Sequence, residues 1–123
     1  MFVDLSIVVS VLASKKALDN EQMVSFGHLG THFDVMNKEF PLQNIERPGV
    51  VFDVSGINDR DIDLRDNTPK DQYCADRGVF IVENLCNLKN LLGDKRQRHF
   101  TAHTYPVKFA DMSGLPCRVV GEI

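Results

Sequence analysis

The segment 78–94, GVFIVENLCNLKNLLGD, constrains the fold more than any other part of this sequence. Its apolar run 79–82 follows a glycine and has the length of a buried strand. Leucines then recur at helical spacing, at Leu85, Leu88, Leu91 and Leu92. Gly93 can end such a helix in a left-handed conformation. A strand that leads directly into an amphipathic helix predicts a mixed α/β domain.

Four further segments have the apolar character of strands. They are residues 2–12, 48–55, 101–110 and 116–123, and residues 26–35 also look extended. Residues 13–23 are compatible with a helix or a loop, and residues 56–70 with a surface helix or a loop. With 123 residues, the chain has room for one compact core. We therefore expect a single domain, 1–123, of five strands with one or two helices.

Composition restricts the partners and the compartment. The net charge of −3 gives no electrostatic reason to expect nucleic acid or an anionic membrane as a partner. The N-terminal run IVVSVLA is too short to span a bilayer and lacks a basic flank. Three cysteines without a CxxC pair, Cys74, Cys86 and Cys117, fit a reducing compartment. These features predict a cytoplasmic protein.

Two histidines and an aspartate lie within seven residues, in the stretch HLGTHFD. In an extended segment the side chains alternate, so His28, His32 and Asp34 would project to one side, whereas a helix would turn Asp34 away. Gly30 would lie between the histidines on that side, where a Cβ would intrude on an ion. Phe33 would face the body of the domain. The spacing therefore works as a ligand edge only in an extended strand.

Two imidazoles and a carboxylate are a common catalytic ligand set for zinc, with one position left for water. The same donors also suit manganese or iron, so spacing alone does not choose the metal. We expect zinc first and manganese as the alternative. The competing interpretation makes His28 and His32 surface or capping residues near a bend.

HLGTHFD resembles the first part of the HxGTHxDxPxH motif of the cyclase family of metal-dependent hydrolases, which includes bacterial kynurenine formamidases and isatin hydrolases. Four other blocks resemble that family in sequence order: VDLS, GVVFDVS, GVFIVENLCNLKNL and YPVKFADMSGLPCRVV. Together these blocks span most of the chain. The resemblance implies a swivelling β/β/α fold, a divalent metal, and a small-molecule substrate in which an amide, a formamide or a cyclic amide is hydrolysed.

The resemblance also implies further metal ligands, which would hold the same ion or a second ion bridged by Asp34. Glu83 falls on the family's ligand glutamate, although on its own it would be interpreted as a carboxylate at a helix N-terminus. The family's other ligand histidine, about twelve residues earlier, is replaced here by Asp71. A carboxylate can coordinate the same ions. Asp71 as an ordinary helix N-cap is an equally good interpretation.

Two departures bear on catalysis. Lys38 occupies the position of the family's general acid/base histidine, and it could act as a base, neutralise Asp34, bind an anion or point into water. His103, on the strand 101–110, could replace the lost base, or it could be an ordinary strand histidine. The middle section, residues 56–70, is also much shorter than in the family, so a wall of the pocket is missing unless a second subunit supplies it.

Two functions of different class remain open at this stage. The first is a compact metal-dependent hydrolase, expected as a homodimer or homotetramer. The second is a catalytically inactive binding or assembly protein that keeps the GTH strand for its geometry.

Overall fold

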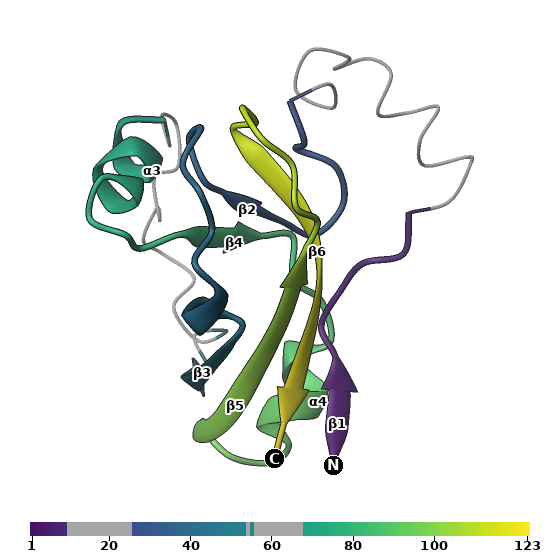
Figure 1. Ribbon diagram of the computed structural model, residues 1–123. Helices are drawn as coiled ribbons and strands as arrows, with labels where there is room; N and C mark the ends of the chain where they lie inside the picture. Colours follow the sequence, from purple (N-terminus) through teal and green to yellow (C-terminus); the bar gives the residue numbers. More distant parts are fainter. Residues whose placement is uncertain (10–25, 54, 56–67) are drawn as a thin grey trace.

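The computed structural model describes residues 1–9, 26–53, 55 and 68–123, and its main element is an antiparallel sheet (Figure 1). The strands are β1 (Phe2–Asp4), β2 (His32–Asp34), β3 (Glu46–Phe52), β4 (Ile81–Glu83), β5 (Gln97–Pro106) and β6 (Gly114–Glu122). The sheet order is β3-β5-β6-β2-β4, and β1 also pairs with β6. Every pairing in the described part of the chain is antiparallel. The sheet curls into a half-barrel.

The long hairpin of β5 and β6 supports the other strands. Its register runs from Thr101 opposite Glu122 to Pro106 opposite Cys117. The other edge of β6 holds two short strands: β2 lies opposite residues 114–116 and β1 opposite residues 120–122. Because β4 pairs with the free side of β2, the strand β2 is held on both edges.

The expected mixed α/β architecture and the swivelling β/β/α fold are wrong. The described residues form two short α-helices, α3 (Thr68–Ala75) and α4 (Leu88–Leu92), and one 3-10 turn, η2 (Leu42–Asn44). Helices of eight and five residues are too short to cover a sheet as a layer. No helix in the described ranges is long and apolar enough to cross a bilayer.

The helix predicted from Leu85 onwards starts late because two asparagines interrupt it. Asn84 and Asn87 take positive φ angles of 59° and 57°, which asparagine tolerates better than most residues. Leu85 lies between them and forms an isolated β-bridge with Ser6. The predicted stop is confirmed, because Gly93 follows α4 with a φ of 64°.

Each of the five predicted strands overlaps an observed strand, although the bounds differ. The segment 79–82 corresponds to β4, 48–55 to β3, 101–110 to β5 and 116–123 to β6. The N-terminal prediction of 2–12 is confirmed only for β1. The segment 13–23 and residues 56–67 of the predicted polar segment lie outside the described residues. The three cysteines are free thiols.

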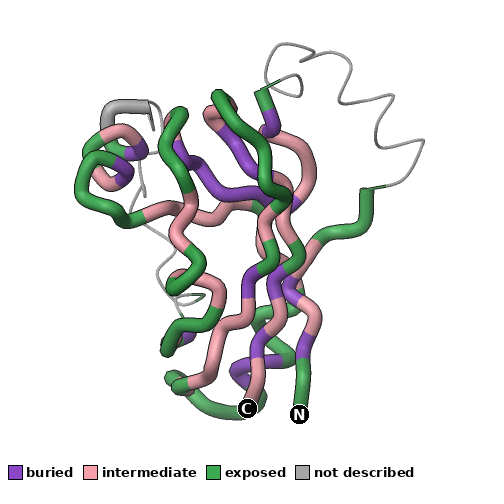
Figure 2. Tube along the Cα trace, in the orientation of Figure 1, coloured by how far each residue is buried: buried purple, intermediate pink, exposed green. Residues whose placement is uncertain are grey.

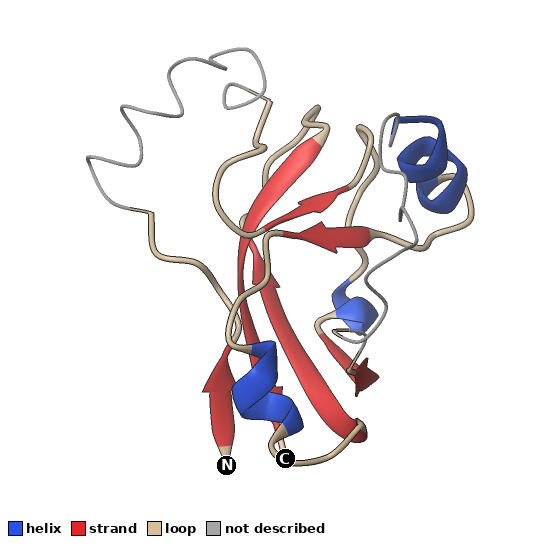
Figure 3. Cartoon of the chain, turned by 180° about the vertical axis from the view of Figure 1, so that it is seen from behind, coloured by secondary structure: helices blue, strands red, loops and turns tan. Residues whose placement is uncertain are grey.

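Two apolar clusters form the core. Figure 2 marks the buried residues along the chain in purple. The larger lies between α4 and the sheet and contains Val3, Leu5, Val51, Leu91, Leu92 and Val119. Figure 3 shows α4 on this face of the sheet, close to both termini. Gly121 makes the close approach possible, because a Cβ there would lie 2.8 Å from Leu91 Cδ1. The smaller cluster contains Phe33, Val35 and Leu115, and it packs against the Phe33 face of β2.

Candidate metal centre

The strand β2 presents two candidate ligands on one face. His32 lies opposite Glu83 of β4, and alternation puts Asp34 on the same side. Phe33 and Val35 point the other way, into the smaller core cluster. The prediction that His32 and Asp34 share a face opposite Phe33 is therefore confirmed.

His28 reaches the same point by a turn and not by an extended strand. Only residues 32–34 of the predicted segment are strand, and residues 26–31 form turns and bends. Gly27 and Gly30 take positive φ angles of 94° and 61°, so the chain doubles back. The Cβ that Gly30 lacks would meet Val9 Cγ2 at 2.6 Å and not an ion, so the role predicted for Gly30 is wrong.

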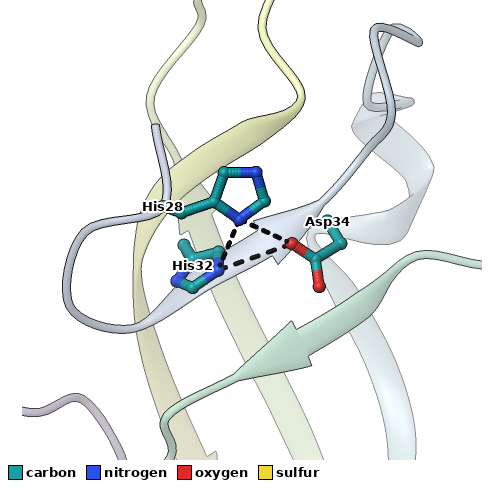
Figure 4. Close-up of side chains that lie close together, drawn as sticks. All are labelled: His28, His32 and Asp34. Carbon is teal, nitrogen blue, oxygen red and sulfur yellow. Dashed lines mark hydrogen bonds and ion pairs between the residues drawn. The ribbon is translucent and has the colours of Figure 1, made fainter. Parts of the chain in front are cut away.

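The three side chains converge with close contacts between their donor atoms (Figure 4). His28 Nδ1 lies 3.1 Å from His32 Nε2 and 3.1 Å from Asp34 Oδ1. His32 Nε2 lies 3.4 Å from Asp34 Oδ1. His32 and Asp34 are almost fully buried, and the side chain of His28 is 13% exposed. These residues form a group that could hold a metal ion.

The triangle has the size of a metal ligand set. The point equidistant from its three corners, in their plane, lies about 1.9 Å from each, close to the 2.0–2.2 Å of zinc–nitrogen and zinc–oxygen bonds. Asp34 Oδ1 is buried and, among the described residues, has no hydrogen-bond partner of acceptable geometry. A bound cation would explain a buried carboxylate oxygen that faces two nitrogens without a hydrogen bond. The residues present therefore fit a divalent ion.

Hydrogen bonds outside the triangle orient both rings. His32 Nδ1 lies 2.9 Å from the Gly30 carbonyl oxygen. Because a carbonyl oxygen can only accept a hydrogen bond, Nδ1 carries the proton. In neutral His32 the lone pair of Nε2 then faces the centre of the triangle. Asn84 Nδ2 donates to the same carbonyl. His28 Nε2 lies 2.8 Å from Ser113 Oγ, a hydroxyl that can accept its proton and leave the Nδ1 lone pair facing inward.

The turn that carries Ser113 is fixed to the His28 loop by a contact between two glycines. The Gly114 amide donates to the Phe26 carbonyl, and a Cβ on Gly27 would overlap the Gly114 carbonyl oxygen. Sequence reasoning missed both Ser113 and Asn84. Asn84 directly follows Glu83, and Ser113 lies in the SGLP block, but neither position carries a local pattern that indicates a contact with a histidine.

Two more carboxylates approach the centre. Glu83 Oε2 lies 3.5 Å from His32 Nε2, and the Glu83 side chain is 36% exposed. Asp34, Asp71 and Glu83 each offer an oxygen within 4.8 Å of the other two. Asp71 is the fourth residue of α3 and not its N-cap, and it is 8% exposed. All five predicted ligands therefore lie together.

The electrostatics of the centre reflect this crowding of negative charge. Burial works to raise the pKa of Asp34, but the two nearby imidazoles outweigh it and lower the pKa to about 2. Burial works to lower the pKa of His32, yet Asp34, the Gly30 carbonyl and Glu83 together raise it. Burial, and then the charge of Asp34, raise the pKa values of Asp71 and Glu83.

The two predicted proton-transfer residues have partners outside this cluster. Lys38 Nζ forms an exposed ion pair with Asp76 at 3.0 Å. His103 Nε2 lies 2.8 Å from Glu122 Oε2, and its Nδ1 lies 3.5 Å from Glu46 Oε2. Within the described residues, the ion pairs of Lys38 and His103 therefore do not involve any of the five candidate ligands.

A cavity lies against the opposite face of β2 and β4. It has a volume of about 290 Å³, and its lining includes Phe33, Phe40, Phe80 and Val82. Because the side chains of Phe33 and Val82 point away from His32 and Glu83, this space does not open onto the ligand atoms. The centre is nearest to solvent on the side where His28 and Glu83 are partly exposed.

Comparisons with protein-family models, with curated proteins and with solved structures found no match for this chain. The cluster is therefore interpreted from its own geometry.

Proposed function

We propose that this chain is a metal-dependent hydrolase in which His28, His32 and Asp34 hold one divalent ion, zinc first and manganese as the alternative. The observation that supports this proposal is the triangle of two ring nitrogens and one carboxylate oxygen, with separations of 3.1–3.4 Å and, at one corner, a buried oxygen that has no hydrogen bond within the described residues. Three protein ligands are typical of catalytic zinc sites, which keep a position for water or substrate.

When bound in such a site, a divalent ion makes water acidic enough to attack at neutral pH and polarises a substrate carbonyl. The protein's own residues prepare the site for that ion. The Gly30 carbonyl holds His32 in the tautomer that turns a lone pair inward, and Ser113 can do the same for His28. Asp34 supplies the negative charge that compensates a cation at this buried position.

The proposed substrates are compounds with an amide, formamide or cyclic amide bond. This class comes from the resemblance of HLGTHFD and the four other blocks to cyclase-type hydrolases. The partly exposed side of the centre, at His28 and Glu83, supports access by a small molecule from solvent.

The test is metal analysis followed by turnover. Protein purified without chelator is assayed for bound zinc, manganese and iron, and then for hydrolysis of N-formylkynurenine and isatin. We expect about one tightly bound ion per chain, with loss of both metal and turnover in His32→Ala. His99→Ala is the matched control, because His99 is exposed on β5 and its side chain hydrogen-bonds only Gln97 among the described residues. Protein that binds no metal would refute the proposal.

A non-catalytic binding or assembly protein is the second candidate. It is favoured by one observation: Lys38 and His103, the residues expected to move protons, are engaged by Asp76 and by Glu122 with Glu46. Metal bound at the triangle without hydrolysis of any amide in a panel would select this candidate over the hydrolase.

A further inference from the structure

The two ring nitrogens of His32 face acceptors that compete for its single proton. On the inner side, a proton on Nε2 would find His28 Nδ1 at 3.1 Å, Asp34 Oδ1 at 3.4 Å and Glu83 Oε2 at 3.5 Å. On the outer side, Nδ1 has one acceptor within the described residues, the Gly30 carbonyl oxygen at 2.9 Å. A neutral imidazole carries its proton on one nitrogen, and an ion binds only the other. The position of this one carbonyl therefore matters for the whole centre.

Gly30 does not hold this carbonyl by its own conformation. It takes a positive φ of 61° and has no side chain, so its backbone has more conformational freedom than that of other residues. The carbonyl oxygen accepts a second hydrogen bond, from Asn84 Nδ2 at 3.1 Å. Because a carbonyl oxygen has two lone pairs, Asn84 and His32 can bond it at the same time. Asn84 therefore holds the acceptor that His32 uses.

Another hydrogen bond joins Asn84 to the next residue of the same segment, in the opposite direction. Thr31 Oγ1 donates to the main-chain carbonyl of Asn84 at 2.7 Å and accepts from the Ile7 amide at 2.9 Å. Thr31 is 4% exposed, so water competes little for its hydroxyl. Asn84 thus donates to Gly30 and accepts from Thr31. These two contacts fix the position of Asn84, although its side chain lies at an exposed site.

The backbone at position 84 restricts which side chain can make this contact. Asn84 has a φ of 59°, in the left-handed region that glycine, asparagine and aspartate adopt most readily. Glycine has no side chain, and an ionised aspartate can only accept hydrogen bonds. Of these three residues, asparagine alone carries a donor for the Gly30 carbonyl. The backbone conformation and the donor together account for an asparagine here.

We infer that Asn84 is a positioning residue for the metal centre: it holds the Gly30 carbonyl, which keeps the proton of His32 on Nδ1 and leaves the lone pair of Nε2 for an ion. The inference rests on the proposed function for the presence of an ion, but the effect on His32 exists in the metal-free protein as well. Without the Asn84 amide, the inner acceptors draw the proton to Nε2, and an ion must then displace it.

The first arm of the test detects the tautomer of His32 directly. Long-range proton–nitrogen NMR spectra of the metal-free protein, at a pH where His32 is neutral, distinguish a proton on Nδ1 from one on Nε2. We expect the proton on Nδ1 in the wild type and a shift toward Nε2 in Asn84→Gly, which keeps the left-handed conformation but loses the amide. Asn84→Asp should shift in the same direction, because its carboxylate cannot donate to Gly30.

Asn87→Gly is the matched control. Asn87 also has a left-handed conformation, with a φ of 57°, and its side-chain amide also donates to a main-chain carbonyl, that of Asp4 at 2.9 Å. This variant should keep the wild-type tautomer, because the carbonyl that it releases does not contact His32. A proton on Nε2 in the wild type, or an unchanged tautomer in both Asn84→Gly and Asn84→Asp, would overturn the inference.

The second arm measures zinc affinity by competition with a chromophoric chelator. Asn84→Gly should weaken zinc binding about tenfold or more, as loss of an outer hydrogen-bond partner of a ligand histidine typically does. Asn87→Gly should keep the wild-type affinity, and thermal unfolding shows whether each variant is folded. A general loss of stability would lower the melting temperature without moving the tautomer. Equal zinc affinity in folded Asn84→Gly and the wild type would overturn the inference.

The outcomes also separate this inference from the proposed function. Wild-type protein that binds no metal would refute the hydrolase proposal, and the NMR arm alone would then decide the role of Asn84. Zinc binding and turnover in the wild type, together with an unchanged His32 tautomer in the Asn84 variants, would refute only the positioning role.

Discussion

Removing the hydroxyl of Ser113 should weaken zinc binding even though Ser113 is not a ligand. Its Oγ lies 2.8 Å from His28 Nε2, and the Gly27–Gly114 contact fixes the distance between the two segments. In Ser113→Ala the outer nitrogen of His28 loses this partner, so the ring is free to rotate and its inner nitrogen becomes less basic. Loss of such an outer hydrogen bond typically costs 10–100-fold in metal affinity, or about 1.4–2.7 kcal/mol.

Competition with a chromophoric zinc chelator measures the dissociation constant directly, and thermal unfolding of the metal-free protein shows that the fold is intact. Ser55→Ala is the matched control. Ser55 is exposed and bonds Asp53, so its removal should leave zinc affinity unchanged. Equal zinc affinity in Ser113→Ala and the wild type, with both folded, would refute the argument that Ser113 orients His28.

Three further predictions concern protons and stability. In the metal-free protein the raised pKa of His32 means that its imidazolium stabilises the fold below about pH 6.5, and this contribution is lost as pH rises through the folded value. Zinc competes with that proton, so zinc affinity should rise with pH. Calorimetry in buffers of different ionisation enthalpy should detect protons released when zinc binds. Zinc binding that releases no proton would contradict this prediction. Leu91→Ala should lower the free energy of unfolding by about 2–5 kcal/mol in urea titrations, because Leu91 is fully buried between α4 and the sheet. Arg118→Ala should lower the free energy of unfolding by less than about 1 kcal/mol in the same assay, since the ion pair between Arg118 and Asp4 is largely exposed. A larger decrease would show that this pair stabilises the fold more than surface ion pairs usually do.

The sequence was sufficient for those parts of the centre that depend on local periodicity. Alternation in a strand places His32 and Asp34 on one side without any knowledge of neighbouring chain segments. The family resemblance added Glu83 and Asp71, which the structure brings to the same place. The observed register explains the former, because Glu83 lies directly opposite His32.

Other parts depend on contacts between distant segments and could not be predicted in this way. His28 is positioned by a turn that packs against Gly114, more than eighty residues later in the chain. The helical pattern of leucines was correct in period but not in extent, because Asn84 and Asn87 adopt left-handed conformations. The α/β prediction followed from that overestimate, since one longer helix would have covered the sheet as a second layer.

The packing of Gly27 against Gly114 has a practical consequence for anyone who wishes to rebuild this centre elsewhere. The backbone of one segment occupies the volume in which the other would carry a side chain, so the two can be joined in only one relative position. Grafting the HLGTHFD peptide alone onto a new scaffold would transfer the donor atoms without their spacing. A graft that keeps this spacing must include residues 26–34 together with residues 112–116, in the relative position that they have here.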